Sequence, residues 1–272
     1  MEHTEARDML AAGAAIAGKV TWLDMPFVII PDGYAAENIE HLLEDPCRKR
    51  GNVVVSDASS FCGYVKRHSG EGSMVYADID QIAGIFALVA VINDHSPEFP
   101  GWKDPTCTMS RKQSVEWQRW MSRDKKAMPQ AEFAAWIEEN LTDIASVDGM
   151  PSGSDMLGLA LGFERTSEKR LKSRVNLQSG GFRLEYVDDE EKDTRTSMEV
   201  FSRFAIGIPV FECAEAAYRI DARLKYRESG GKLSFWFELI RPDKAFRQAV
   251  DEEVASIAAA TELPIINGKA GI

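Results

Sequence analysis

Hydrophobic and polar residues follow two different periods along this chain, and the period changes near its middle. The first half contains helical stripes, with apolar residues at i, i+3 and i+4, whereas the second half is dominated by alternation at every second residue. The longest apolar run, Gly84 to Ile92, has no polar position. It predicts a strand that is covered on both faces and lies at the centre of the first core.

The first half is predicted to be a mixed α/β region. Short strands are expected at 53–55 and 74–79. Helices are expected after Asp32, from Ser56 or Asp57, from the capping-box pattern of Ser110 to Gln113, and from Pro129. In the last of these helices the inward residues are Phe133, Trp136, Ile137, Leu141 and Ile144, and the outward residues are Glu132, Glu138, Glu139 and Asp143.

The second half is predicted to be an antiparallel sheet backed by a C-terminal helix. After a short apolar helix at 156–163, two hairpins are expected, one turning at 179–181 and one at Gly230-Gly231. A third run holds Val200, Phe204 and Ile206, and Asp243 is expected to cap the final helix. The pattern as a whole predicts an α+β fold.

A stretch rich in Gly, Ser and Pro at 146–154 separates the two patterns. It predicts two domains, a mixed α/β domain at 1–148 and a domain of antiparallel sheet plus C-terminal helix at 149–272, or one continuous domain with a connection at this point. A chain of 272 residues is long enough for either arrangement.

Composition narrows the class of protein. Hydrophobic residues make up 44% of the chain and charged residues 28%, as in ordinary folded domains. The longest apolar run is about half the roughly 20 residues that a helix needs to cross a bilayer, and the N-terminus lacks the basic start of a secretion signal. We therefore expect a cytoplasmic protein without a membrane segment. Cys47, Cys62, Cys107 and Cys213 are widely spaced and are expected to be buried free thiols.

The net charge of −11 argues against a protein whose whole surface coats nucleic acid, but the charge is unevenly distributed. Residues 1–163 hold 14 Lys and Arg against 24 Asp and Glu, whereas residues 164–247 hold 17 against 15. Many of these cations occupy the polar phase of the predicted hairpins, and Trp236 shares that phase. The cations are Arg170, Lys172, Arg174, Arg183, Arg219, Arg223, Lys225 and Arg227.

A sheet built from both hairpins would carry these side chains on one face. Such a face could follow a phosphate backbone and stack a base on its aromatic residue. Alternatively, it could be a solvated face balanced by Asp221, Glu185 and Glu238, or it could be covered by the acidic half of another subunit. The sequence leaves these alternatives open and favours a structural or inter-subunit role.

Candidate catalytic residues are few. His95 follows Asp94 at the exit of the apolar strand, where catalytic groups often lie, with Asp94, His68 or His41 as partners. Metal-binding histidine spacings, nucleophile elbows and phosphate-binding glycine loops are absent from the sequence, so no metal or cofactor is predicted. The acidic pair Glu138-Glu139 and the run 188–191 are expected to be solvated surface.

Several segments together resemble the uncharacterised YfdQ-like family of phage and prophage proteins. They are Phe61 to His68, Val91 to His95, Pro100 to Trp102, Glu116-Trp117 with Trp120, Gln130 to Ile144, Ala222 to Arg227 and Phe235 to Leu239. The resemblance implies a phage or prophage origin and no established activity.

Three hypotheses follow. The first is a non-enzymatic, self-associating phage accessory protein, indicated by the missing catalytic motifs, the exposed strand edges and the opposite charge of the two halves. The alternative is a nucleic-acid-binding protein of phage recombination or replication that uses the basic sheet face. The third is a hydrolase-type enzyme centred on Asp94 and His95.

Overall fold

A computed structural model describes residues 43–166, 170–176, 182–187, 195–229 and 232–271. The expected helix after Asp32 and the acidic run 188–191 lie outside the described residues. The chain divides into two units, Met1–Lys49 and Arg50–Ile272. All elements described below belong to the second unit. The predicted boundary near residue 148 stays a prediction.

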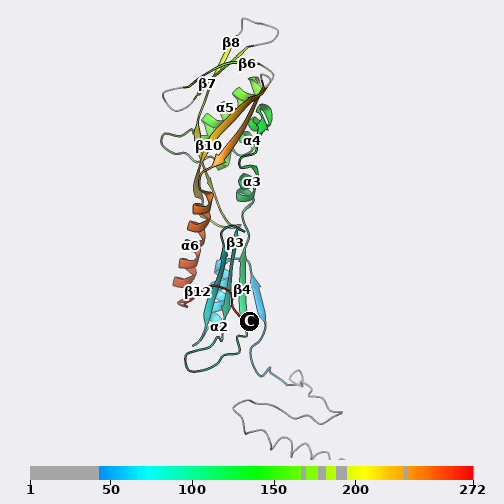
Figure 1. The fold of residues 1–272 in the computed structure, drawn as a ribbon. Coiled ribbons are helices and arrows are strands. Elements are labelled where there is room, and N and C mark those ends of the chain that lie inside the picture. Colours follow the sequence, from blue (N-terminus) through cyan, green and yellow to red (C-terminus); the bar gives the residue numbers. More distant parts are fainter. Residues whose placement is uncertain (1–42, 167–169, 177–181, 188–194, 230–231, 272) are drawn as a thin grey trace, which may run out of the picture. The chain divides into compact units, whose positions relative to one another are not determined.

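The first sheet has five strands in the order β1-β4-β3-β2-β12 (Figure 1). These strands are β1 (Asn52–Val55), β2 (Met74–Asp80), β3 (Ile85–Val91), β4 (Thr106–Arg111) and β12 (Ile265–Asn267). The pairs β1–β4 and β2–β12 are parallel, and the central pairs are antiparallel. The apolar run around β3 is central in this sheet, as its composition predicts.

One face of the first sheet is buried, and the other is buried only in part. Phe86, Leu88 and Ala90 of β3 are buried beneath helix α2 (Ala58–His68) and helix α6 (Pro242–Thr261), whereas Ile85 is exposed and Val89 is only partly buried. The second face of β3 is therefore covered only in part, because Val91 is buried and Ala87 is half-buried, but Ile85 is exposed. Apolar composition alone cannot distinguish a strand buried on two faces from one whose second face is partly open.

Helix α2 follows the sequence prediction closely. The Asp57 side chain accepts a hydrogen bond from the Ser60 N–H at 2.8 Å and so caps the helix. Phe61 and Val65 are buried against the sheet, and the ring of the half-buried His68 lies 4.5 Å from that of Tyr64. His68 is therefore a packed helix-face residue.

The expected helix start at Ser110 is wrong. Ser110 and Arg111 continue β4, whose ladder with β3 extends to the Phe86–Arg111 pair. Helix α3 (Val115–Arg123) instead begins after Ser114, whose hydroxyl accepts a hydrogen bond from the Trp117 N–H at 3.0 Å. The sheet ladder satisfies the backbone groups that the capping box was expected to satisfy.

The second sheet has the order β5-β11-β10-β9. Its strands are β5 (Met128–Pro129), β9 (Arg203–Ile208), β10 (Tyr218–Ser229) and β11 (Lys232–Leu239). The hairpin β10–β11 confirms the predicted alternation. On the core face, Phe235 packs against Phe133 of helix α4 (Gln130–Glu139) and Phe163 of helix α5 (Gly153–Thr166).

Two details of the helices differ from the prediction. Helix α4 ends at Glu139, and Leu141–Asp143 form a 3₁₀ turn. Asp143 was expected to face outward but is buried, and its Oδ2 accepts a hydrogen bond from Trp120 Nε1 at 2.8 Å. Helix α6 begins after Arg241, and the Asp243 carboxylate binds the Arg241 guanidinium at 2.7 Å. Asp243 therefore does not cap this helix.

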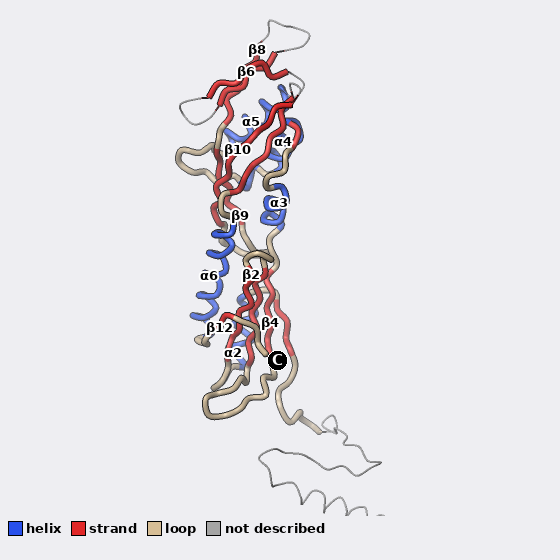
Figure 2. The backbone as a smooth tube through the Cα atoms, in the orientation of Figure 1, coloured by secondary structure: helices blue, strands red, loops and turns tan. Residues whose placement is uncertain are grey.

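The third sheet contains the first predicted hairpin. Its order is β6-β7-β8, with β6 (Arg170–Asn176), β7 (Phe182–Val187) and β8 (Arg195–Val200) antiparallel to one another. Strands β8 and β9 were predicted as one run but belong to different sheets. The tube in Figure 2 shows the β6–β8 strands as a group apart from the β9–β11 strands.

Candidate functional site

The face of the second sheet opposite its core carries many charged side chains. Register pairs place Arg203 of β9, Arg223 of β10 and Glu238 of β11 side by side, and Lys225 beside Trp236. The side chains on this face alternate with the buried ones along each strand. We name this surface the basic face, and it comprises Arg203, Arg219, Asp221, Arg223, Lys225, Arg227, Lys232, Ser234, Trp236 and Glu238.

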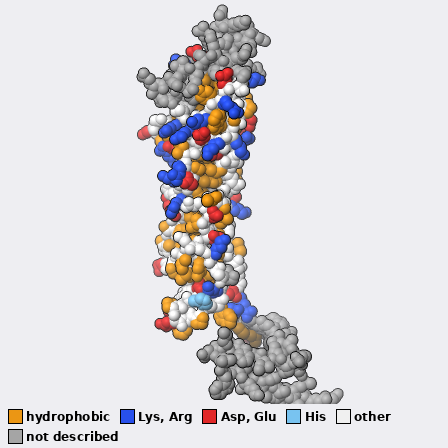
Figure 3. Space-filling view, viewed as in Figure 1, with side chains coloured by type: hydrophobic (Ala, Val, Ile, Leu, Met, Phe, Trp, Pro, Cys, Tyr) orange, Lys and Arg blue, Asp and Glu red, His pale blue; other side chains and the backbone are white. Residues whose placement is uncertain are grey.

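Of the two acids on the basic face, Asp221 forms an ion pair with one cation and Glu238 with none among the described residues. Asp221 binds Arg219 at 2.7 Å, and Glu238 Oε1 accepts a hydrogen bond from Trp236 Nε1 at 3.4 Å. Within the part of the chain that the structure describes, Arg223, Lys225 and Arg227 form no ion pair, and all three are exposed. In the face shown in Figure 3, Lys and Arg side chains gather over the region of β10.

One cross-strand pair adds to the positive charge. Arg203 and Arg223 are direct register partners and both are exposed. Like charges placed directly opposite each other destabilise a sheet. A bound polyanion would remove that repulsion. Sequence reasoning missed Arg203 and Lys232, although both follow the same two-residue alternation as the cations that it selected.

The cations of the first hairpin are not part of the basic face. Arg170, Lys172 and Arg174 lie on β6 and Arg183 lies on β7, in the third sheet. The ladder between β6 and β7 also shifts register between Leu171 and Ser173, so strict alternation is broken within β6. The expectation of one sheet built from both hairpins is therefore wrong, because sequence spacing cannot say which hairpins join edge to edge.

The Asp94 carboxylate and the His95 imidazole are not hydrogen-bonded to each other. Asp94 is buried, its Oδ2 accepts the Tyr76 hydroxyl hydrogen, and its Oδ1 accepts the His95 backbone N–H at 2.7 Å. The His95 ring is on the exposed side, where Nδ1 accepts the Gly101 N–H at 2.9 Å. Asp94 thus orders the backbone of His95 and makes no hydrogen bond to its imidazole.

The charge state of Asp94 follows from the same contacts. Burial favours the protonated acid and raises its pKa, but the Tyr76 hydroxyl, the His95 N–H and the Lys103 ammonium, 3.6 Å away, stabilise the carboxylate. Together they hold the pKa of Asp94 below its usual value. Asp94 is therefore a structural carboxylate of this loop.

The loop after β3 is held together by backbone contacts. The side-chain oxygen of Asn93 accepts the Asp104 N–H at 2.8 Å, and its carbonyl accepts the Lys103 N–H at 3.1 Å. Gly101 packs so closely on the Asn93 and Asp94 carbonyl oxygens that a Cβ atom would overlap with them.

Two aromatic side chains project from this ordered loop. Phe99 is 71% exposed and Trp102 is 74% exposed. Tyr and Trp are enriched at protein interfaces, whereas single exposed apolar residues are normal on a folded domain. Sequence reasoning selected Asp94 and His95 here but did not select the aromatic residues.

Other candidate chemistry is limited among the described residues. They contain no cluster of three or more His, Cys, Asp and Glu that could hold a metal ion, and no helix in the described part is long and apolar enough to span a membrane. Cys107 is buried, and burial raises its pKa to about 11. Cys47 and Cys213 are exposed, so the expectation that all four thiols are buried is wrong.

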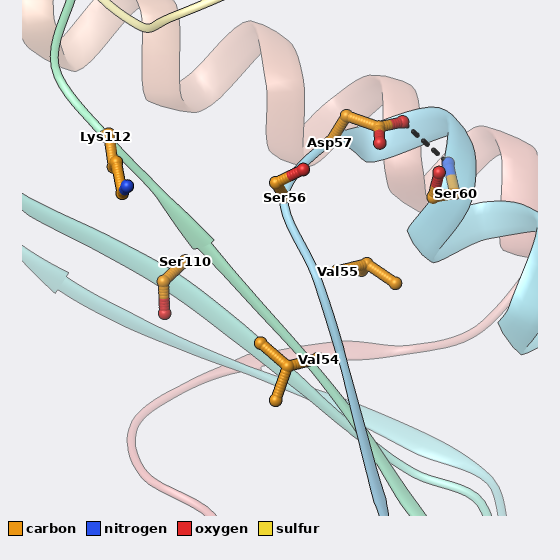
Figure 4. A pocket seen from close by; sticks show the side chains of 7 residues that line it. All are labelled: Val54, Val55, Ser56, Asp57, Ser60, Ser110 and Lys112. Atoms are coloured by element: carbon orange, nitrogen blue, oxygen red, sulfur yellow. Dashed lines mark hydrogen bonds between the residues drawn. The ribbon is translucent and has the colours of Figure 1, made fainter.

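An open pocket of about 370 Å³ lies beside β1 (Figure 4). Val54, Ser110 and Lys112 line one part of it, and Ser56, Asp57 and Ser60 line the part next to the start of α2. The Asp57 carboxylate already caps the helix through Ser60, as the dashed line shows. Because this acid occupies the helix N-terminus, the pocket is a poor site for a small anion.

One family model matches almost the whole chain. The model of a family described as an uncharacterized conserved protein, DUF2303, matches residues 2–270. The chain belongs to the DUF2303 family. No curated protein and no solved structure matches it. Membership of DUF2303 therefore identifies a domain of unknown function. Any inference about the function of this DUF2303 chain has to come from the surfaces described above.

Proposed function

We propose that this chain binds single-stranded nucleic acid along the basic face. The observation that carries the proposal is the series of exposed cations Arg223, Lys225 and Arg227 on β10, which no described acid neutralises by an ion pair. A phosphate backbone is the common cellular ligand whose charge repeats along a line.

The spacing of the cations suits an extended strand. Alternate residues of a β-strand are about 6.8 Å apart, so the three side chains form a straight row along β10. A chain of phosphates with flexible torsions can adjust its spacing to such a row. A rigid duplex presents its phosphates along two curved tracks, which a short row of this kind meets at few points.

Trp236 supplies the second component of a single-strand site. It lies directly across from Lys225 on the same face, partly exposed, with its indole N–H directed to Glu238. Stacking of a base on an aromatic ring contributes about 1–3 kcal/mol and tolerates any sequence. The basic face therefore supports binding without strong sequence preference.

Fluorescence anisotropy of a labelled oligodeoxythymidylate at about 50 mM salt tests the proposal. The wild-type chain is expected to bind, and its log Kd is expected to rise with log salt by about 0.7 for each phosphate contact. Replacing Arg223 and Arg227 with Glu should abolish binding at that salt concentration, and Trp236→Ala should weaken it about tenfold with little change in salt slope.

The matched control places the same charge change elsewhere. Lys244 and Arg247 are exposed on helix α6, and replacing both with Glu changes the net charge equally. This variant should retain most of the wild-type affinity. Equal loss in both double variants, or no binding by the wild-type chain, would contradict the proposal.

A second candidate function is self-association, which we propose on a different observation. The first sheet carries exposed apolar side chains at both of its edges, with Val54 of β1 70% exposed and Ile266 of β12 44% exposed. Isolated sheets in solution rarely leave such edges uncovered. A non-enzymatic accessory role in a phage or prophage, acting in the host cytoplasm, is the setting that the sequence resemblance supports.

A further inference from the structure

Glu238 places a carboxylate among the cations of the basic face. It lies directly across from Arg223 in the β10–β11 ladder, and Arg223 lies across from Arg203 of β9. A negative charge at this point repels the phosphates that the neighbouring cations attract. The carboxylate therefore weakens binding to a phosphate backbone unless it contacts another part of the ligand.

The Glu238 side chain contacts Trp236 and not the arginine across from it. Opposite charges that face each other in an antiparallel pair attract, yet no ion pair joins Glu238 to a cation within the described ranges. Its Oε1 instead accepts a hydrogen bond from Trp236 Nε1 at 3.4 Å, along strand β11. Both side chains are half-buried. The carboxylate therefore lies at the rim of the indole ring, beside any base that stacks on that ring.

This carboxylate keeps most of its capacity to accept hydrogen bonds. A carboxylate has two oxygens with about four acceptor positions and no donor. The indole N–H uses one of these positions, and no other described group donates a hydrogen bond to Glu238. The remaining positions attract donors of a base and repel its acceptors. Hydrogen bonds to a charged group are also roughly twice as strong as those between neutral groups.

The four bases differ in what they offer to a carboxylate. A base in a single strand exposes its Watson–Crick edge. On that edge guanine carries two adjacent donors, the N1–H and the N2 amino group, which match the two oxygens of a carboxylate. Adenine and cytosine carry one amino donor beside a ring-nitrogen acceptor, and thymine carries one N–H between two carbonyl oxygens. Guanine therefore fits a carboxylate best, and thymine fits it worst.

We propose that Trp236 and Glu238 form a base-binding subsite that prefers guanine over thymine in a single strand. This inference rests on the proposed function and adds a base preference to it. The indole stacks on the base, and the Glu238 carboxylate accepts hydrogen bonds from the guanine N1–H and N2 amino group. One such contact is expected to favour guanine by about fivefold, a modest preference beside the sequence-independent contribution of stacking and phosphate contacts.

Fluorescence anisotropy of the full chain with three labelled strands of equal length tests the subsite. The strands are oligodeoxythymidylate, the same strand with isolated thymines replaced by guanine, and the same strand with hypoxanthine at those positions. Isolated guanines avoid the formation of G-quadruplexes. The wild-type chain should bind the guanine strand about fivefold more tightly than the thymine strand. Hypoxanthine lacks the N2 amino group, so its strand should lose most of this preference.

Two variants separate base contact from charge. Glu238→Gln removes the charge and keeps the shape of the side chain, so it should bind the thymine strand more tightly and show no preference for guanine. Asp221→Asn makes the same charge change on the same face, at a carboxylate that already binds Arg219. It should raise the affinity for both strands equally and keep the preference. Circular dichroism melting checks that each variant folds.

The possible failures of the subsite and of the proposed function are distinct. If the wild-type chain binds none of the three strands, the proposed function is wrong and the subsite with it. If the wild-type chain binds all three strands with equal affinity, only the guanine subsite is overturned. A guanine preference that persists in Glu238→Gln, or one that Asp221→Asn also removes, would likewise overturn the subsite and leave the phosphate contacts of the basic face standing.

Discussion

Arg111 at the end of β4 and Glu253 on helix α6 form an ion pair, with 3.0 Å between Nε and Oε1 and with side chains only 7% and 15% exposed. The guanidinium also donates a hydrogen bond from Nη1 to the Ser56 carbonyl at 3.1 Å and lies 5.5 Å from the centre of the Phe211 ring. Arg111 therefore connects the C-terminal helix to the first sheet and to the segment that precedes α2.

Removing Arg111 is expected to destabilise the fold substantially. Arg111→Ala leaves the Glu253 carboxylate in a poorly hydrated position without its partner, and breaking such a buried pair costs about 3 kcal/mol. Urea denaturation followed by circular dichroism measures the change. Arg247→Ala, which breaks the exposed Arg247–Asp251 pair on the same helix, should cost less than about 1 kcal/mol. Equal losses in the two variants would contradict this assignment.

The stability of the first sheet is expected to fall at acid pH partly through Asp94. Its pKa in the folded chain is below that of a free aspartate, so the native state holds the proton less tightly than the unfolded state. The contribution of Asp94 is therefore fully present above about pH 4, the ordinary aspartate range, and is lost as the pH falls through the lower folded value.

The variant Tyr76→Phe tests that reasoning, because it removes the hydroxyl that donates to Asp94 Oδ2. It should bring the pKa of Asp94 closer to its ordinary value and reduce the loss of stability between pH 5 and pH 3. Denaturation midpoints of wild type and variant across this interval provide the comparison. Parallel curves for the two proteins would show that the hydroxyl does not hold this carboxylate ionised.

Two glycines are expected to respond in opposite directions to substitution with alanine. Gly101→Ala places a methyl group onto the Asn93 and Asp94 carbonyl oxygens and should disrupt the loop after β3. Gly63→Ala, in an open position on helix α2, should stabilise the chain by about 0.5–1 kcal/mol because alanine favours helix. Thermal melting measures both. A stabilising Gly101→Ala would show that the loop tolerates displacement.

The sequence predicted local structure best where the residue pattern has one physical reading. The alternation of Arg223, Leu224, Lys225 and Tyr226 is compatible only with a strand exposed on one face, and the structure confirms it. Ser110 misled the prediction, because a hydroxyl followed by Gln113 suits a helix cap as well as a strand end. The ladder with β3, formed by residues more than 20 positions away, decided between them.

In the candidate site too, the sequence predicted local alternation correctly but could not predict contacts between distant segments. Spacing selected Arg219, Arg223, Lys225, Arg227 and Trp236 correctly as residues of one face, because the alternation lies within one hairpin. Residue spacing could not exclude Arg170 and Lys172, because the local sequence does not determine whether two hairpins belong to the same sheet. It also could not find Asp143 as the buried partner of Trp120, because a carboxylate in helical phase usually faces water.

By itself, the sequence determined the α+β class, the two hairpins and the excess of positive charge in the second half, because short-range periodicity and side-chain charge do not depend on distant contacts. Only the tertiary structure decided that the hairpins occupy separate sheets, that Asp94 holds a loop together, and that β1 is left at an edge. Each of these depends on hydrogen bonds between segments far apart in the chain, whose pairing energy is similar for many alternative registers and partners.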